Sequence, residues 1–536
     1  MKRCPACRRD YFDDSLLYCL DDGSALLEGP VGIHSAATSS EESATIQLHL
    51  SQPPSSFEPP TQAHNGNAIA VLPFANMSRD EDAEYLSDGL AEELLNVLSR
   101  INGLRVAGRT SSFSFKGKQT TFAEIGQQLR VSSVLEGSVR TAGKRVRISV
   151  QLVNVSDGYH LWSQTYDRTM DDIFAIQDDI AASVVAEVRS RLLDKEPDPS
   201  LSRQVKVEIA EAVKDRADDP EAHRLMLLGR HFAQRVTAED LTKAVDYLER
   251  ALELDPQNPQ CWVELGLARV AQASYGFVEP ARGFEQVKEC ANTALSIRSD
   301  FAAAHALLAH MRLVVEFDLK GADEAIHRAL ESEPENLHAI IACGLISRDL
   351  CRFAESEEMY RRVVEIDPLD LRAYRGLGGS LWFSGRPDAA ERGFRKALEL
   401  SPQQSSVPAF LSLVLLDLGR IEEARAQAGN EPAGSWRGWA QAIIENAAGR
   451  RDEAERILDE FIRENREIGA FQIAEVYASM GRTDEAFEYL EFAFTVRDSG
   501  IASIVASPLL KPLHSDARWQ PLIRKIGIPE EYWPGS

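Results

Sequence analysis

Long apolar runs are missing from this sequence of 536 residues. No segment approaches the ~18–20 consecutive apolar residues that a membrane-spanning helix needs. Residues 1–5 lead straight into polar sequence, without the apolar core of a signal peptide. We therefore expect a cytoplasmic protein without a membrane span.

Cysteine is scarce, and its seven residues are unevenly distributed. Three lie near the N-terminus, and four are scattered through sequence with a helical pattern: Cys261, Cys290, Cys343 and Cys351. Secreted domains that depend on disulfides carry dense cysteines at regular spacing instead. We interpret the four scattered cysteines as small buried apolar residues of a protein in a reducing compartment.

Recognisable catalytic motifs are also missing. The sequence contains no GxSxG, HExxH, DFG or Rossmann glycine pattern, and its 11 histidines show no metal-binding spacing. Residues 108–118 gather glycines, hydroxyls and lysines, but not in the GxxxxGK[ST] order that places backbone amides around a phosphate. We expect a polar loop there. The sequence predicts a protein that is not an enzyme, with no catalytic or cofactor-binding residue.

Positive charge is in short supply in the C-terminal half of the chain. Residues 196–536 hold 40 Lys and Arg against 57 Asp and Glu, which accounts for -17 of the formal net charge of -24. An acidic surface repels phosphate backbones and favours basic partners or simple solubility. Nucleic acid is therefore a poor candidate ligand for this half.

The chain is too long for one hydrophobic core, because domains hold roughly 100–200 residues. Composition and residue pattern divide the chain into a cysteine-marked segment, a linker, a mixed domain, a connecting helix, a repetitive region and a capping segment. Their ranges are 1–27, 28–66, 67–195, 196–215, 216–500 and 501–536. The second segment is rich in Ser, Thr and Pro and cannot bury a core, so we expect a disordered linker.

The cysteine-marked segment contains a CxxC motif. Cys4 and Cys7 can point at one ion when the turn between them is tight, and Cys19 supplies a third sulfur. The segment resembles short N-terminal zinc ribbons, although Asp22 stands where such a ribbon has its fourth cysteine. The resemblance implies a structural Zn²⁺ site at Cys4, Cys7, Cys19 and Asp22. A knuckle without metal and a redox CxxC pair stay open as alternatives.

Residues 67–195 alternate between strand and helix patterns. An apolar run from Ala68 to Phe74 is typical of a buried strand, and a helical stripe then follows at Leu86, Leu90, Leu94, Leu98 and Ile101. A second strand is expected at 104–107, and Thr121 with Glu124 has the capping-box spacing of a helix start. Residues 131–166 have the alternation of a three-stranded meander, and 171–193 have that of a closing helix.

This α/β segment resembles the TolB amino-terminal-like (FlgO-related) domain that bacterial regulators carry ahead of repeat arrays. The resemblance rests on the sequence segments IAVLPF, EYLSDGLAEELLNVLS, GLRVAGRTSSFSFKGK, VLEGSVR, VRISVQLV, HLWSQTYDR and IFAIQDDIA. What it implies about function is limited, because the family is described by its architecture more than by an activity.

The region 216–500 repeats. Pro334, Pro368 and Pro402 each end an apolar helical stretch at a spacing of 34 residues, the tetratricopeptide period. Between them, small residues such as Gly344 and Gly378 recur where two antiparallel helices would nearly touch. The region resembles tetratricopeptide (TPR) arrays, and we expect about seven repeats in an all-α superhelix, since single repeats cannot bury their apolar faces alone.

In TPR proteins the first helix of each pair lines the concave face. By that resemblance Arg348, Arg372, Arg375 and Trp382 are candidate partner-binding residues, able to hold a carboxylate or an acidic peptide by charge-assisted hydrogen bonds. Solvated surface arginines and a tryptophan at the edge of the core are the alternative interpretation. Oligomeric state is not predicted.

All parts of the chain are thus typical of binding modules. The sequence predicts a non-enzymatic scaffold or adaptor in bacterial signalling or regulation, with a protein or peptide in the TPR groove. The alternative is a transcriptional or signalling regulator that contacts nucleic acid or nucleotide through the N-terminal ribbon and the TolB-like domain, since Lys2, Arg3, Arg8 and Arg9 make the N-terminus basic.

Overall fold

The chain forms two compact units, residues 1–56 and 57–536, in a computed structural model. The structure describes most residues from 68 to 533 and three short strands before them. Outside the description lie 1, 4–9, 12–26, 29–67, 79–83, 102, 143–144, 170–172, 193–204, 206, 211–218, 234–236, 275–276, 279, 403, 433 and 534–536. Among the described helices, none is long and apolar enough to cross a bilayer.

The first unit contains a small antiparallel sheet. Its strands β1 (Lys2–Arg3), β2 (Asp10–Tyr11) and β3 (Leu27–Glu28) lie in the order β2-β1-β3. The predicted metal ligands Cys4, Cys7, Cys19 and Asp22 and the linker 28–66 fall almost entirely outside the described residues. The zinc site and the disordered linker therefore stay predictions.

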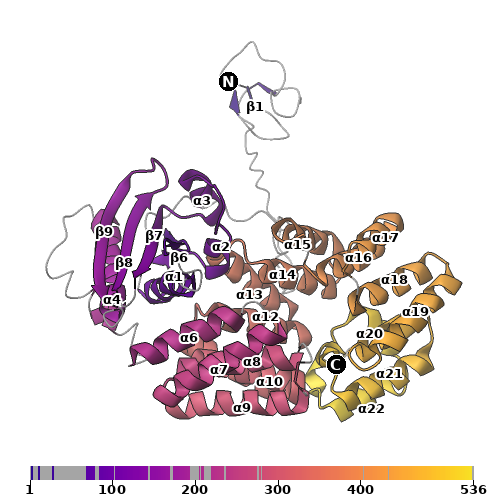
Figure 1. The fold of residues 1–536 in the computed structure, drawn as a ribbon. Coiled ribbons are helices and arrows are strands. Elements are labelled where there is room, and N and C mark those ends of the chain that lie inside the picture. The colour runs from indigo at the N-terminus through magenta and orange to yellow at the C-terminus, as the bar shows by residue number, and fades with distance from the viewer. Residues whose placement is uncertain are drawn as a thin grey trace, which may run out of the picture. The chain divides into compact units, whose positions relative to one another are not determined.

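The second unit begins with a mixed sheet in the order β6-β4-β7-β8-β9 (Figure 1). Parallel pairs join β4 to β6 and β7, whereas β7, β8 and β9 form the antiparallel meander. The strands are β4 (Ala68–Val71), β5 (Ala75–Asn76), β6 (Arg105–Val106), β7 (Ser133–Ala142), β8 (Arg145–Asn154) and β9 (His160–Thr169). The predicted strands and meander are thereby confirmed.

Helices cover both faces of this sheet, because its central strand is apolar on both sides. Ile69 and Val71 of β4 face the core made with α1 (Glu84–Ser99) and α4 (Ile173–Leu192). Ala68 and Ala70 face the opposite way, toward α3 (Phe122–Leu129). The two-residue alternation of the strand thus places two separate cores on its two faces.

Local signals at two helix starts had different outcomes. Thr121 accepts from the amide of Glu124 while the Glu124 carboxylate accepts from the amide of Thr121, so the predicted capping box is confirmed. The polar loop predicted over 108–118 is wrong in part, because α2 (Arg109–Phe113) forms there. Its serines Ser111 and Ser112 are buried, because this turn packs against protein and not against solvent.

Helix pairs make up the rest of the unit, and the described residues contain eight of them, where the sequence predicted about seven. The pairs are α6 (Pro220–Ala233) with α7 (Ala238–Leu254), α8 (Pro259–Ser274) with α9 (Pro280–Ile297), α10 (Ala302–Met311) with α11 (Leu319–Ser332), α12 (Leu337–Asp349) with α13 (Phe353–Ile366), α14 (Leu371–Phe383) with α15 (Pro387–Leu400), α16 (Val407–Asp417) with α17 (Ile421–Gly429), α18 (Ser435–Ala447) with α19 (Arg451–Asn465), and α20 (Ala470–Ser479) with α21 (Thr483–Val496). Figure 1 follows them from magenta to yellow.

Small residues set the distance within a pair. A Cβ atom on Gly378 of α14 would lie 3.0 Å from the Phe394 ring of α15, closer than ordinary van der Waals contact, so glycine favours the close approach of the two helices. The first helices of neighbouring pairs contact one another: α12 contacts α14, and α16 contacts α18. Among the described residues, neighbouring second helices make no contact of similar extent. The first helices therefore line the inner side of the array.

The C-terminal segment packs back on the middle of the array. The Ser503 hydroxyl of η4 (Ser499–Ser503) donates to Asp349 Oδ1 at 2.9 Å. The Arg497 side chain donates to the carbonyl of Val315 in η3 (Arg312–Glu316), a π-helical turn after α10. Beyond them, η5 (Pro508–Leu513) and α22 (Trp519–Ile526) bury Leu510, Leu513 and Trp519 against the same core.

The α/β domain contacts the array first through α6. The Arg230 guanidinium lies 3.3 Å from Glu92 and 3.2 Å from Glu93, both on α1, and 2.9 Å from Glu264 on α8. Arg230 is only 8% exposed. One buried cation therefore ties the domain to the first two helix pairs.

A second contact joins α2 to the turn between α13 and α14. The amide of Gly108 donates to the carbonyl of Ile366 at 3.1 Å, and the amide of Leu369 donates to the Ser111 hydroxyl at 2.7 Å. The Leu369 side chain packs into the core beside α3. The α/β domain and the array are therefore joined by polar and apolar contacts over the same turn.

Candidate functional site

The candidate site lies on the inner helices α12 and α14, where Arg375 carries a charge that no described residue neutralises. Its side chain is exposed to solvent. Surrounding protein lowers the pKa of Arg375, and the like charge of Arg348 lowers it further. A cation of this kind gains from any anion that reaches the inner surface.

Arg348, the second predicted residue, is held in place by three neighbours. Its Nε and one terminal nitrogen donate to Asp349 Oδ1 at 2.9 and 2.7 Å, and the same terminal nitrogen donates to the Ser503 hydroxyl at 3.2 Å. Its guanidinium carbon lies 4.9 Å from the centre of the Phe383 ring. The charge of Arg348 is therefore partly balanced, and its position is fixed by the C-terminal segment.

Tyr360 of α13 completes this part of the surface. Its ring packs against the backbone of Gly344 and Gly376, and burial raises the pKa of its hydroxyl to about 12. No hydrogen-bond partner of that hydroxyl lies among the described residues. Tyr360 interacts electrostatically with both Arg348 and Arg375. The surface thus offers two guanidinium groups and one hydroxyl donor.

Arg372 lies one turn before Arg375, but its charge is already balanced. Its Nε and a terminal nitrogen donate to Asp370 Oδ2 at 3.2 and 2.6 Å. Asp370 is fully buried and also accepts from the amide of Arg372, so it caps α14. Arg372 therefore contributes less net positive potential to the surface than Arg375 does.

Trp382 does not lie on the inner surface. It is 3% exposed, packs against Phe383 and Phe410, and donates from its indole nitrogen to Asp417 at 2.6 Å. The prediction that its ring is available to a partner is corrected, because the next helix pair covers it. Arg348, Arg372 and Arg375 do lie together on α12 and α14.

Sequence reasoning missed Tyr360, Asp349 and Phe383 as parts of this surface. Tyr360 occupies a large-residue position of the repeat, where the pattern predicts core packing, and only its hydroxyl reaches the arginines. Asp349 follows Arg348 directly and could have been recognised as a pairing carboxylate. Ser503, 155 positions from Arg348, gives no signal in the sequence.

The scattered cysteines are positioned largely as predicted. Cys261, Cys290 and Cys343 are buried in helices, and burial raises the pKa of the Cys290 and Cys343 thiols to about 11. Cys351 differs: it is partly exposed and lies in the turn after α12 with a φ of 58°. Three of the four are therefore core residues of the array.

Family comparisons agree with the helix pairing. Models described as tetratricopeptide repeat match residues 236–258, 344–405 and 377–435. Helices α7 and α13 to α17, with the end of α12, thus lie in segments that match tetratricopeptide-repeat models. A further model, described as HilA/YgeH-like transcriptional regulator, second domain, matches residues 65–183. This is a different match from the TolB-like one that the sequence predicted, whereas the α/β character of the segment is confirmed.

Among curated proteins, the chain is similar to "Putative adenylate cyclase 3" of Rhizobium meliloti (strain 1021). The two are 39% identical over 206 residues, which is 38% of this chain and 33% of the relative. The chain therefore spans about a third of the length of that curated relative.

Solved structures similar to the chain include PilF of Pseudomonas aeruginosa and a tetratricopeptide repeat protein of Parabacteroides merdae. For PilF the identity is 22%, the match covers 41% of this chain and 96% of the other, and the TM-score is 0.33. For the Parabacteroides protein the identity is 17%, the coverage is 51% and 99%, and the TM-score is 0.35.

Proposed function

We propose that the chain is a non-enzymatic scaffold whose repeat array binds an acidic segment of a partner protein at Arg375, Arg348 and the Tyr360 hydroxyl. The observation that carries this proposal is the unbalanced charge of Arg375 on the inner helices. Elsewhere on the array arginines are commonly paired, as Arg395 is with Glu391 and Arg420 with Glu423. Tetratricopeptide arrays are protein-binding modules, which supports the same conclusion.

A carboxylate is the group that this surface suits best. Arg375 can offer paired N–H donors, Arg348 can offer its other terminal nitrogen, and the Tyr360 hydroxyl can add a further donor. The surrounding protein strengthens such hydrogen bonds, because it excludes part of the competing water. An acidic side chain or a free C-terminus of a peptide has the matching chemistry.

The test is quantitative capture of the partner from the native host by the full chain and by Arg372→Glu/Arg375→Glu. Charge reversal should reduce recovery at least about tenfold, because a hydrogen bond to a charged group contributes about 1.5–3 kcal/mol. Arg395→Glu, on the second helix α15, is the matched control and should bind like wild type. Unchanged capture by the double variant, or equal loss in the control, contradicts the proposal.

We propose a regulatory context for this scaffold. It is supported by the HilA/YgeH-like match at residues 65–183 and by the similarity to a relative named putative adenylate cyclase. The TolB-like resemblance of the same segment stays a prediction. Under this second proposal the N-terminal part contacts nucleic acid or nucleotide. Filter binding of the full chain to DNA across a salt series tests it, and binding without salt dependence, or no binding, contradicts it.

We also propose that Cys4, Cys7, Cys19 and Asp22 hold a structural Zn²⁺ ion. The support is the CxxC spacing with a third thiolate donor downstream. Elemental analysis of residues 1–30 fused to a carrier tests the site: one equivalent of zinc is expected. A content well below one equivalent, unaffected by Cys4→Ser, contradicts it.

A further inference from the structure

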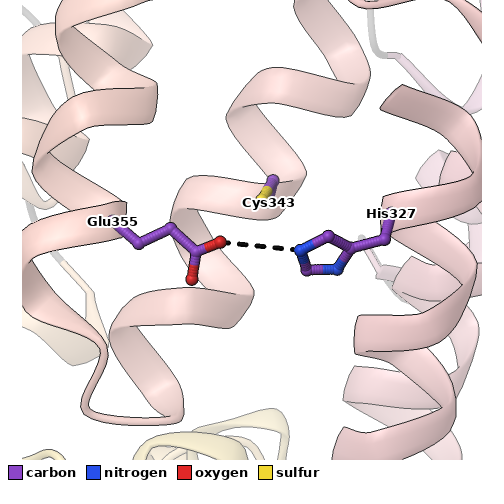
Figure 2. A group of neighbouring side chains, drawn as sticks. All are labelled: His327, Cys343 and Glu355. Carbon is purple, nitrogen blue, oxygen red and sulfur yellow. Dashed lines mark ion pairs between the residues drawn. The ribbon is translucent and has the colours of Figure 1, made fainter. Parts of the chain in front are cut away.

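Three potential metal ligands from three helices converge between the third and fourth helix pairs. His327 comes from α11, Cys343 from α12 and Glu355 from α13. Their ligand atoms all lie within 4.8 Å of one another, and His327 Nε2 is 3.6 Å from Glu355 Oε1. Figure 2 shows His327 and Glu355 reaching toward each other, with Cys343 on the helix between them.

Neighbouring groups hold two of the donors in the orientation that a metal needs. His327 Nδ1 lies 2.8 Å from the carbonyl of Asp323, which can only accept, so Nδ1 carries a proton and the neutral ring presents the Nε2 lone pair to the site. The Ser347 hydroxyl donates to Glu355 Oε2 at 2.9 Å, which leaves Oε1 facing His327. Supporting hydrogen bonds of this kind accompany ligands in established metal sites.

The donors match ions of the zinc class. Nitrogen, sulfur and oxygen ligands bind zinc tetrahedrally at about 2.0–2.3 Å, so two donors on one ion stand about 3.3–3.8 Å apart. His327 Nε2 and Glu355 Oε1 already have this spacing at 3.6 Å, and the Cys343 sulfur, within 4.8 Å of both, needs a further approach of up to about 1 Å. Because the ligands number three, and because His327 and Glu355 are 44% and 31% exposed, a fourth position remains for water.

The charges around the three ligands also balance with a divalent ion. Glu355, Asp323 and a Cys343 thiolate would carry three negative charges. Arg352 contributes one positive charge, through ion pairs to Asp323 and, at 3.1 Å, to Glu355. A divalent ion adds two and makes the group neutral.

We propose that His327 Nε2, Cys343 Sγ and Glu355 Oε1 bind one divalent ion of the zinc class, joining α11 to α12 and α13. On binding, the thiol proton of Cys343 passes to solvent and the thiolate becomes the sulfur ligand. The ion would cross-link two successive repeats close to Arg348, which lies on the same helix as Cys343. Nothing in this proposal depends on the partner-binding function.

The alternative is that each residue has an ordinary role. Cys343 occupies an apolar position of the repeat, and His327 and Glu355 are a partly exposed pair on α11 and α13. The distinction requires a probe of direct sulfur coordination, because zinc itself is spectroscopically silent. Cobalt(II) serves, since a cobalt–thiolate bond gives a charge-transfer band in the near ultraviolet.

The experiment uses the full chain with Cys4→Ser, Cys7→Ser and Cys19→Ser, so that the N-terminal thiols cannot contribute. Cobalt titration should give a charge-transfer band that saturates at about one equivalent and is abolished by one equivalent of zinc. His327→Gln and Cys343→Ala should each weaken cobalt binding at least tenfold, because each removes one of the three proposed ligands. Cys290→Ala, at an equally buried cysteine, should leave the titration unchanged.

Two outcomes overturn the proposal: absence of the charge-transfer band in this background, and a band that persists in Cys343→Ala. His327→Gln keeps the test decisive if Cys343→Ala fails to fold, because the His327 side chain is 44% exposed and is not part of the hydrophobic core. A titration that His327→Gln does not alter then counts against the site.

Discussion

Ser111 and Asp367, 256 positions apart in the sequence, form the central hydrogen bonds between the α/β domain and the repeats. The backbone amide of Ser111 donates to Asp367 Oδ1 at 2.9 Å, and its hydroxyl donates to the same oxygen. Asp367 is fully buried and precedes Pro368, one of the three prolines that recur at a spacing of 34 residues. A position of the repeat pattern has thus become part of an interdomain contact.

Titration of Asp367 should make the folded protein more stable at acidic pH. Burial raises the pKa of Asp367 from 3.8 to about 6, against the opposing effect of the Ser111 hydrogen bonds. The folded state then binds a proton that the unfolded state has released, so stability falls as pH rises from about 4 to about 6. This difference in pKa between the unfolded and folded states corresponds to about 3 kcal/mol in the free energy of unfolding.

Thermal unfolding of wild type and Asp367→Asn between pH 4 and pH 7 measures this effect. Asparagine cannot titrate, so the decline from pH 4 to pH 6 should be shallower in the variant than in wild type, and the decline caused by Glu475 should remain in both proteins. A wild-type profile that is flat from pH 4 to pH 6, or a decline over that range that is equally steep in the variant, refutes the assignment. Asp388→Asn, on the first turn of α15, is a control that should keep the wild-type profile.

Replacement of Arg230 by methionine should destabilise the chain strongly. The side chain pairs with Glu92, Glu93 and Glu264, and its loss removes the cation that these largely buried carboxylates share. Removal of one member of a buried ionic group costs about 3–5 kcal/mol. Denaturant unfolding monitored by circular dichroism provides the measurement.

The matched control for Arg230 is Arg250→Met, at an exposed pair with Asp246 on α7. Exposed pairs contribute about 0–1 kcal/mol, so this variant should unfold almost like wild type. Equal midpoints for the two variants would show that the network around Arg230 contributes little to the contact between the domain and the repeats.

Glu475 should control stability above neutral pH. It is 5% exposed, accepts from the Ser507 hydroxyl at 2.6 Å, and its burial raises the pKa of its carboxyl from 4.5 to about 8. The folded state therefore holds a proton up to about pH 8, and stability decreases between pH 4.5 and pH 8. Glu475→Gln should remove the part of this decrease that lies between pH 6 and pH 8.

Melting temperatures at half-unit steps from pH 6 to pH 9 test the role of Glu475. Asp367 is present in both wild type and Glu475→Gln and titrates mainly below this pH range. It therefore affects both melting temperatures equally. A wild-type melting temperature that is constant from pH 6 to pH 8 would mean that Glu475 is ionised in the folded protein, contrary to the prediction.

Gly378→Ala should destabilise the repeat array by about 1–3 kcal/mol, the range for overpacking a tight contact. The added Cβ would meet the Phe394 ring at 3.0 Å, and α14 and α15 would have to separate. Gly429→Ala is the control, since no atom lies within 4 Å of a Cβ at that helical position. It should be neutral or stabilise by up to about 1 kcal/mol. Denaturant midpoints compare the two variants.

Features that depend on a few neighbouring residues were predictable from the sequence. The capping box at Thr121 and Glu124 requires only groups within one helical turn. The alternation in Ala68–Val71 and the 34-residue spacing of Pro334, Pro368 and Pro402 predicted strands and helix pairs correctly, because burial of one face imposes a period on the chain.

The tertiary structure alone decided which charged groups remain available. The sequence gives no sign that the three inner arginines differ. In the structure Asp349 and Ser503 hold Arg348, and the buried Asp370 neutralises Arg372. The charge of Arg375 remains unbalanced. Trp382 is buried because the next pair covers it. The convergence of His327, Cys343 and Glu355 and the contact of Ser111 with Asp367 likewise depend on how the helix pairs stack and where the α/β domain docks. Those distances arise from packing over the whole unit, and no local pattern encodes them.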